Sequence, residues 1–144
     1  MGETARQVVF PAKDVVAIEE VDLHEPGEGQ LLIEMKRTLI STGTELAYLQ
    51  GITAQIQAGK HKYPIVPGYS SAGDVIAVGP GVTDFKVGDR VCGSAKHATR
   101  IVVPARGSAH IPDGVSYEDS TFSTLGLVSM NGLRLAQPQL GEVV

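Results

Sequence analysis

The chain has 144 residues and a mass of 15.2 kDa, the size of a single domain. Its 42% of hydrophobic residues can build a core at this size, so folding requires neither a disulfide nor a metal. The formal net charge is −4 and the basic residues form no run, which argues against a nucleic-acid partner. No apolar segment approaches the ~18 residues of a membrane span, and no signal-peptide pattern opens the chain. The single cysteine, Cys92, excludes an intrachain disulfide, and we expect a cytoplasmic protein with no membrane partner.

The first two thirds of the sequence has the pattern of short strands between turns. Its glycines, 17 in the whole chain and well above average usage, fall between short aliphatic runs. In one such run Leu31, Ile33 and Met35 recur with the period of two that places side chains on one face of a strand. The predicted strands are residues 8–10, 15–21, 31–39, 74–78, 90–92 and 98–103. We therefore predict a mainly β fold.

A short helical turn is predicted between the third and fourth strands. Residues 45–50 have apolar side chains at helical spacing, with Thr44 as a candidate cap and Gly51 as the end. The polar residues 52–63 that follow are typical of a surface loop.

A longer helical region is predicted near the end of the chain. Ser116 and Asp119 have the spacing of a capping box, which marks a helix start. Apolar residues continue at helical spacing to Leu135, as one helix or as two with a break near Gly126, and Pro138 stops the pattern. Residues 140–144 resemble a turn and the first residues of a further strand, so we expect the sequence to be truncated there.

One glycine-rich turn has to be distinguished from a nucleotide-binding loop. Gly79-Pro80-Gly81 begins a Gly-x-Gly pattern, but Asp84 stands at the sixth position and no helix pattern follows. We predict a hairpin turn here and no self-sufficient nucleotide site in the chain.

Residues 67–91, PGYSSAGDVIAVGPGVTDFKVGDRV, are the most specific feature of the sequence. They resemble the medium-chain dehydrogenase/reductase family, whose GroES-like catalytic domain carries this pattern of glycines followed by Gly-Asp-Arg-Val. Residues 41–45 and 122–126 are similar to the branch that includes the bacteriochlorophyllide dehydrogenases. The resemblance implies a GroES-like, partly open β-barrel over residues 1–115. Residues 116–144 would then be a helical connector and the start of a truncated Rossmann domain.

The resemblance also assigns positions to the family's catalytic zinc. The three zinc ligands fall on Thr42, Tyr69 and Thr124, whose neutral hydroxyls are poor zinc donors. The four-cysteine lobe for structural zinc is absent. The four histidines of the chain are scattered without a partner at ligand spacing. We therefore expect no zinc and no other metal.

Without zinc, hydrogen-bond donors would polarise the substrate. The resemblance implies Thr44 and Tyr69 as these catalytic donors, although Thr44 could equally cap a helix and Tyr69 could fill the vacated metal pocket. Ala47 stands where some alcohol dehydrogenases carry a relay histidine, so the usual proton exit is missing. The substrate-binding positions that the resemblance implies are Thr42, Glu45, Ser70 and Thr124, and the cofactor-binding positions are Gly43 and Val128.

From these residues and the resemblance, we predict that the chain is the substrate domain of a zinc-independent, NAD(P)-dependent oxidoreductase. Its partners would be a small-molecule substrate and the Rossmann domain that carries the cofactor, so we expect this chain alone to be inactive and to bind no cofactor. Two alternatives are a standalone GroES-like module that binds a partner protein and the domain of a quinone or enoyl reductase. An uncovered apolar surface over residues 122–144 would also favour a homo-oligomer.

Overall fold

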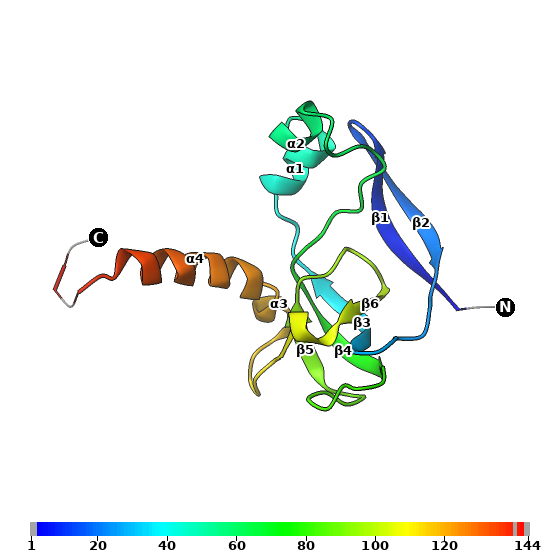
Figure 1. The fold of residues 1–144 in the computed structure, drawn as a ribbon, viewed down its shortest axis with the longest axis vertical. Helices are drawn as coiled ribbons and strands as arrows, with labels where there is room; N and C mark the ends of the chain where they lie inside the picture. Colours follow the sequence, from blue (N-terminus) through cyan, green and yellow to red (C-terminus); the bar gives the residue numbers. More distant parts are fainter. Residues whose placement is uncertain (1–2, 140, 143–144) are drawn as a thin grey trace.

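The computed structural model describes residues 3–139 and 141–142, and over these the chain is mainly β (Figure 1). Five strands form one antiparallel sheet in the order β6-β3-β4-β5-β7, and β1 and β2 form a separate hairpin. Neither sheet closes into a barrel, which confirms the predicted partly open architecture. The strands are β1 (Thr4–Ala12), β2 (Val15–Asp22), β3 (Gln30–Thr38), β4 (Ser71–Val78), β5 (Arg90–Gly93), β6 (Arg100–Pro104) and β7 (Ser108–His110).

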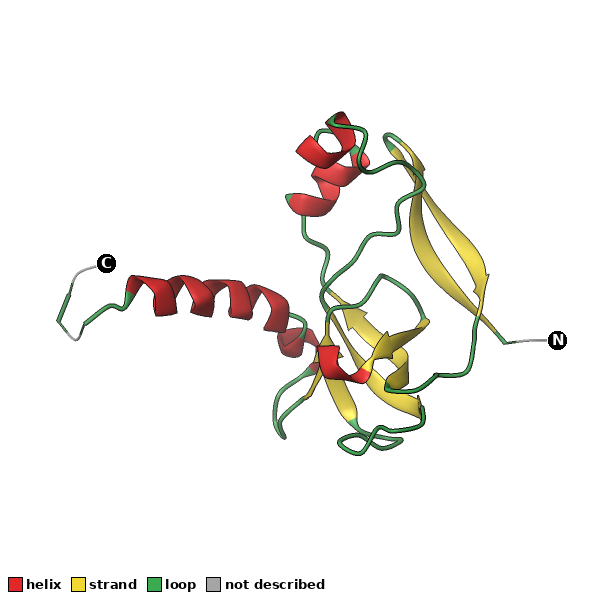
Figure 2. Cartoon of the chain, viewed as in Figure 1, coloured by secondary structure: helices red, strands yellow, loops and turns green. Residues whose placement is uncertain are grey.

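The helices lie at two ends of the molecule (Figure 2). Two short helices stand next to the β1–β2 hairpin, and a longer one extends away from the sheets. They are α1 (Thr44–Leu49), α2 (Ala54–Gln57), α3 (Tyr117–Ser120) and α4 (Ser123–Ala136), and a 3-10 turn η1 covers Ala105–Gly107. None of the described helices combines the length and the apolar character that crossing a bilayer requires.

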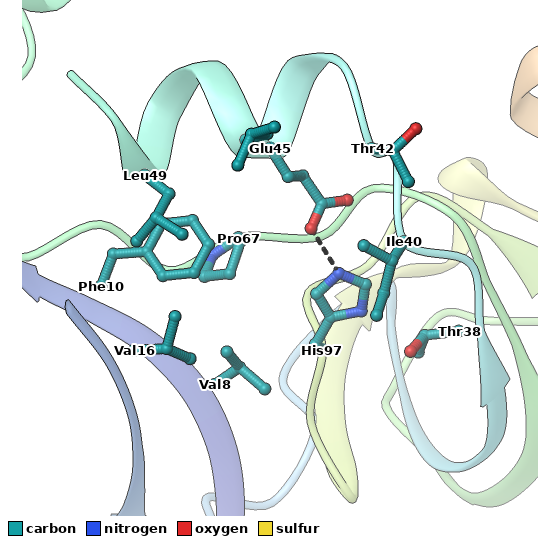
Figure 3. A pocket seen from close by; sticks show the side chains of 11 residues that line it. Val8, Phe10, Val16, Thr38, Ile40, Thr42, Glu45, Leu49, Pro67 and His97 are labelled. Atoms are coloured by element: carbon teal, nitrogen blue, oxygen red, sulfur yellow. Dashed lines mark hydrogen bonds and ion pairs between the residues drawn. The ribbon is translucent and has the colours of Figure 1, made fainter. Parts of the chain in front are cut away.

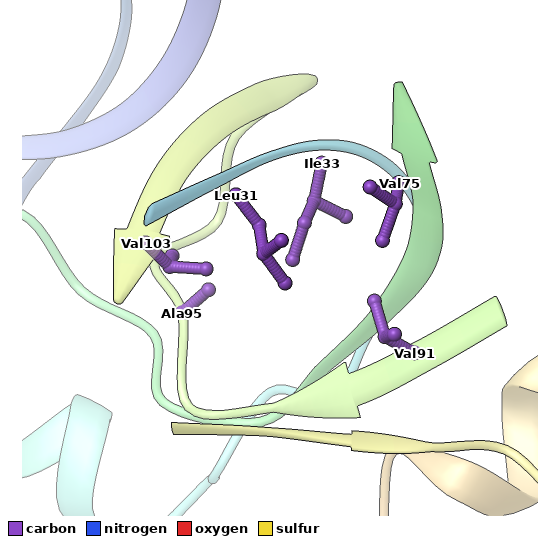
Figure 4. Close-up of a cluster of buried hydrophobic side chains, with 6 residues drawn as sticks. All are labelled: Leu31, Ile33, Val75, Val91, Ala95 and Val103. Carbon is purple, nitrogen blue, oxygen red and sulfur yellow. The ribbon is translucent and has the colours of Figure 1, made fainter. Parts of the chain in front are cut away.

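The main core lies on the concave side of the five-stranded sheet (Figure 4). Leu31 and Ile33, two residues apart on β3, point into it at 0% and 4% exposure, as the period of two predicts. Strands β4, β5 and β6 and the loop after β5 supply the other buried members, Val75, Val91, Val103 and Ala95. Leu32 is also buried, although it alternates with these residues, so this strand has apolar contacts on both faces.

The β1–β2 hairpin is attached to the rest of the molecule by backbone hydrogen bonds. Phe10 and Ile65 exchange a pair of them at 2.8 and 2.9 Å, and the Val8 N–H donates to the carbonyl of His97 at 2.9 Å. At the tip of the hairpin, the Asp14 N–H donates to the Leu49 carbonyl at the end of α1. The hairpin therefore faces α1 and the loop before β6.

The predicted helices are correct in outline, and the structure differs from the sequence predictions in the break between the C-terminal helices, in α2 and in β7. Ser116 caps α3 as predicted, and its hydroxyl accepts from the Asp119 N–H at 2.9 Å. The break between the two C-terminal helices lies at residues 121–122 and not at Gly126, which is inside α4. The segment predicted as a loop, residues 52–63, contains α2, and the three-residue β7 was not predicted. Helix α4 ends before Pro138, whereas the predicted further strand includes residues 140 and 143–144, which lie outside the described residues.

Side-chain contacts dock α3 onto the sheet. The Tyr117 hydroxyl donates to the carboxylate of Asp74 on β4, and the guanidinium of Arg90 lies 4.5 Å from the centre of the Tyr117 ring. Arg90 also donates to the Val115 carbonyl at 2.6 Å, and its neighbour Asp89 pairs with Lys86 at 2.6 Å. The hydrogen bond to Asp74, with partial burial, raises the pKa of Tyr117 above its ordinary value.

We expect Tyr117 to make unfolding depend on pH in the alkaline range. Because its pKa is raised in the folded protein, its contribution is complete below about pH 10 and is lost as the pH rises through the folded pKa. In Tyr117→Phe, the free energy of unfolding should therefore fall less steeply above pH 10, and the tyrosine transition at highest pH should disappear from an absorbance titration. In the control Tyr48→Phe that transition should persist; its loss there would contradict the assignment.

A close backbone approach requires a glycine in the loop between β4 and β5. A Cβ on Gly79 would lie 1.9 Å from the carbonyl oxygen of Gly27. This loop joins two antiparallel neighbours, which confirms that 79–81 is a hairpin connection.

We expect Gly79→Ala to lower the free energy of unfolding by about 3 kcal/mol, because the backbone must move to admit the methyl group. Gly107→Ala is the matched control, since nothing lies within 4 Å of the added Cβ. Urea unfolding of both variants measures the difference. Equal stabilities of the two variants would contradict the close approach.

Candidate functional site

A buried glutamate and a buried histidine form a pair beside α1. Glu45 is 5% exposed and His97 is 7% exposed, and His97 Nε2 lies 2.7 Å from Glu45 Oε2. The other carboxylate oxygen, Oε1, accepts the backbone N–H of Ser41 at 3.0 Å. With Glu45 as a carboxylate, both of its oxygens accept hydrogen bonds, and we assign His97 Nε2 as the nitrogen that donates to Oε2. The pair therefore buries the Glu45 carboxylate in the interior of the domain, and the carboxylate orients the imidazole ring of His97.

The backbone around His97 fixes the position of this ring. The His97 N–H donates to the Pro67 carbonyl at 3.1 Å, and its carbonyl accepts from Val8 on β1. His97 is thus held between the hairpin and the segment before β4. The ring's second nitrogen, Nδ1, is buried and has no hydrogen-bonding partner in the described part of the chain.

The pair lies in the wall of a cavity of about 410 Å³ between the hairpin and α1, which we call the hairpin pocket (Figure 3). Most of its lining is apolar. The apolar residues are Val8, Phe10, Val16, Ile40, Leu46, Leu49 and Pro67, and the polar ones are Thr38, Thr42, Glu45 and His97. A buried polar pair in an apolar wall is typical of a small-molecule site, where a few polar groups fix the orientation of a ligand.

The sequence analysis assigned Glu45 to the site but treated His97 as one of four scattered histidines. These two residues are 52 positions apart, in α1 and in the loop between β5 and β6. No local spacing connects them, so only the folded chain identifies the pair.

Thr44 and its neighbours form the exposed start of α1. The N-cap position is Gly43, which makes no side-chain cap, and Thr44 is the first helical residue. The interpretation of Thr44 as the cap is therefore wrong, and its exposed hydroxyl is not engaged in capping. Thr42 is also exposed, at the rim of the hairpin pocket.

The structure brings Tyr69 and Thr124 together. The Thr124 hydroxyl donates to the Tyr69 carbonyl at 3.0 Å, which joins the start of α4 to the segment before β4. Ser70 is 1% exposed, and its hydroxyl has no hydrogen-bonding partner among the described residues. Its carbonyl accepts from the Leu39 N–H at 2.9 Å, so this segment also lies beside the chain that leads to Thr42.

The predicted cofactor positions are both on the surface. Gly43 is exposed, with nothing within 4 Å of an added Cβ, and Val128 is 68% exposed on α4. Val128 follows Thr124 by four residues, so the two share a helix face.

The residues at the predicted zinc-ligand positions do not fit that metal. Thr42 and Tyr69 offer only neutral hydroxyls, and the Thr124 hydroxyl is bonded to a backbone carbonyl. Over residues 3–139 and 141–142, no three His, Cys, Asp or Glu side chains are grouped to hold a metal ion. Catalytic zinc requires three such donors and an open position.

We expect Glu45→Ala to lower the free energy of unfolding by about 3–5 kcal/mol, since it leaves buried His97 without its charged partner. Glu45→Gln is the control: it keeps the volume and an oxygen that can accept the Ser41 N–H, so it should lose less. Denaturant unfolding measures both. A loss below about 1 kcal/mol for Glu45→Ala would contradict a mutually satisfied buried pair.

Comparison with known proteins gives consistent matches. Residues 27–127 match the family model described as the alcohol dehydrogenase GroES-like domain. A 2-desacetyl-2-hydroxyethyl bacteriochlorophyllide A dehydrogenase of Cereibacter sphaeroides is 36% identical over 102 residues, covering 69% of this chain and 31% of that protein. A zinc-type alcohol dehydrogenase-like protein of Schizosaccharomyces pombe is 34% identical over 134 residues, covering 81% and 38%.

A quinone oxidoreductase of Escherichia coli, solved in complex with NADPH, superposes with a TM-score of 0.76 at 25% identity. The match covers 90% of this chain and 40% of that one. The chain thus spans about a third of the length of the two curated relatives above. Together with the open antiparallel sheet, these matches show that the chain belongs to the medium-chain dehydrogenase/reductase family, as its GroES-like N-terminal domain.

Proposed function

We propose that this chain is the substrate-side domain of a zinc-independent, NAD(P)-dependent oxidoreductase. The observation that carries the proposal is the set of Thr42, Tyr69 and Thr124 at the positions that correspond to zinc ligands. The Thr124 hydroxyl is already bound to the Tyr69 backbone, which gives it a structural role in place of metal binding. The division of the chain at residue 115 and a cytoplasmic location remain predictions.

The substrate would bind against the exposed start of α1 and the segment around Tyr69. There the hydroxyls of Thr44 and Tyr69 would donate hydrogen bonds to the substrate oxygen and stabilise the negative charge that develops on it. The absence of a cap interaction at Thr44 supports this role, because its hydroxyl is available to a ligand. Thr42, Ser70 and Thr124 would shape the same side of the site, with Glu45 behind them.

When bound, NAD(P)H would supply the hydride. Gly43 and Val128 are the residues of this chain that we assign to nicotinamide contact, and both are exposed. The lack of a side chain at Gly43 leaves open space through which a planar ring can approach the backbone. The phosphates and the adenosine would be bound by residues outside this sequence, so we propose that the chain alone has no turnover.

The exposed apolar side chains of α4 are consistent with a partner domain that covers this helix. Five apolar residues within two and a half turns have exposures from 50% to 78%: Leu127, Val128, Met130, Leu133 and Leu135. An apolar surface of this kind is normally covered. A Rossmann domain bound to the nicotinamide would cover it in the intact enzyme, and self-association of the isolated chain is the alternative.

The proposal is tested on the longer native protein and on this chain, assayed in parallel with NADH and NADPH. We expect hydride transfer only with the longer protein, no loss of rate with 1,10-phenanthroline, and far less than one zinc per chain by mass spectrometry. A stoichiometric metal, or a rate that the chelator abolishes, would contradict zinc independence. A native protein whose intact mass is 15.2 kDa would instead favour a standalone partner-binding module.

A second candidate is a reductase of quinones or of activated double bonds. It is supported by the superposition on the quinone oxidoreductase, whose fold this chain shares. The same assay distinguishes the two, because oxidation of secondary alcohols would favour the first reaction class, and reduction of quinones or enones would favour the second.

A further inference from the structure

We propose that another cavity, between the β4–β5 loop and η1, binds a small zwitterion, namely a free amino acid with an apolar side chain. Arg106 binds its carboxylate and Glu28 binds its ammonium group. We call this cavity the loop pocket. Its volume is about 730 Å³, within the range of small-molecule sites. None of its lining residues is assigned above to substrate or nicotinamide contact, and the β4–β5 loop lies at the opposite end of the molecule from α1 and α2 (Figure 1).

The floor of the loop pocket is apolar and held in place by the core. Val82, Phe85 and Ala105 line the pocket, and the same three side chains pack against the main core. They are half-buried, so each keeps part of its surface open to the cavity. The Phe85 ring also stacks on His110, with the ring centres 4.6 Å apart. This floor fits the aliphatic part of a ligand.

A free guanidinium supplies the positive charge of the loop pocket. Arg106, Ser108 and His110 alternate along η1 and β7, and all three line the cavity. His110 Nε2 donates to the Asp84 carbonyl at 3.0 Å, which orients that ring. The Arg106 guanidinium, in contrast to that of Arg100, makes no ion pair or hydrogen bond with any described residue. A guanidinium binds a carboxylate through two parallel hydrogen bonds, so Arg106 is available to a ligand of that kind.

A free carboxylate lies close to this guanidinium in the fold. The Ala105 N–H donates to the Gly29 carbonyl at 2.9 Å, so the backbone segments that carry Arg106 and Glu28 are adjacent. The Glu28 side chain nevertheless lies against the β4–β5 loop, where a Cβ on Gly81 would be 3.9 Å from its Oε1. Among the described residues, neither Glu28 nor Arg106 belongs to an ion pair. One ligand that carries both charges can satisfy both side chains.

The other charged groups of the loop pocket exclude simpler ligands. Asp84 adds a second carboxylate, whose Oδ1 accepts from the Thr83 hydroxyl at 3.1 Å. An anion would therefore face two carboxylates, Glu28 and Asp84, against the single permanent cation Arg106. A cation would leave the guanidinium unpaired. A zwitterion matches both signs, and its apolar side chain covers the floor.

We test the site by titrating the isotope-labelled 144-residue chain with L-leucine, with 4-methylpentanoate, which lacks the ammonium group, and with 3-methylbutylamine, which lacks the carboxylate. We expect saturable NMR shifts of the Val82 methyl groups and of the Arg106 side chain with leucine. Each analogue should bind about fivefold more weakly or worse, because it loses one charge-assisted contact. An analogue that binds as tightly as leucine would overturn the zwitterion, and the absence of saturable shifts would overturn the site.

Two variants assign the two contacts, and both change exposed side chains, so the fold should persist. In Glu28→Gln, leucine should lose its advantage over 4-methylpentanoate and keep its advantage over 3-methylbutylamine. Arg106→Gln should have the reverse effect. The matched control Arg134→Gln removes the same charge on α4, outside the loop pocket, and should leave all three affinities unchanged.

An advantage that survives in the variant designed to remove it would overturn the assignment of that contact. Equal losses of affinity in Arg106→Gln and Arg134→Gln would overturn the site, since they would reflect the charge of the chain as a whole. None of these readouts requires hydride transfer, so failure here leaves the proposed function testable by itself.

Discussion

The buried hydrogen bond between Glu45 and His97 connects the parts of this domain on which any function depends. Its two residues come from α1 and from the loop before β6, and the backbone of His97 is bonded in turn to the hairpin. A charge at 5% exposure is tolerated only when its oxygens are satisfied, as those of Glu45 are by His97 and Ser41. The position of α1, and hence of the residues before it, follows from this constraint.

The same helix separates two chemically different regions. On one side, Gly43 and Thr44 at its start are exposed; on the other side it closes the apolar hairpin pocket, and Thr42 lies at the rim between the two. A metal at the first region would need donors that its hydroxyls do not supply. Membership of the family therefore predicts the fold of the domain. The reaction that the domain supports depends instead on which polar side chains are available at the start of α1 and in the hairpin pocket.

Apolar burial is distributed unevenly over the domain. The five-stranded sheet has a dense core around Leu31, Val75 and Val91, each at 1% exposure or less. Helix α4 has no buried residue among those described, although its sequence is apolar. Its backbone hydrogen bonds lie within the helix, but a helix of this length is only marginally stable without a packed face, and its side chains gain little from burial in this chain.

The sequence by itself determined the strands other than β7, the capped start of α3, the family and the absence of good zinc donors at three positions, because each depends on local periodicity, a short motif or residue identity. It misplaced the break before α4 and the cap of α1, since several residues near each boundary satisfy the same local pattern. Only the tertiary structure paired His97 with Glu45 in the wall of the hairpin pocket, with no partner for Nδ1 among the described residues. The physical reason is that a contact between residues 52 positions apart depends on how sheet, hairpin and helix pack together, which no local spacing encodes.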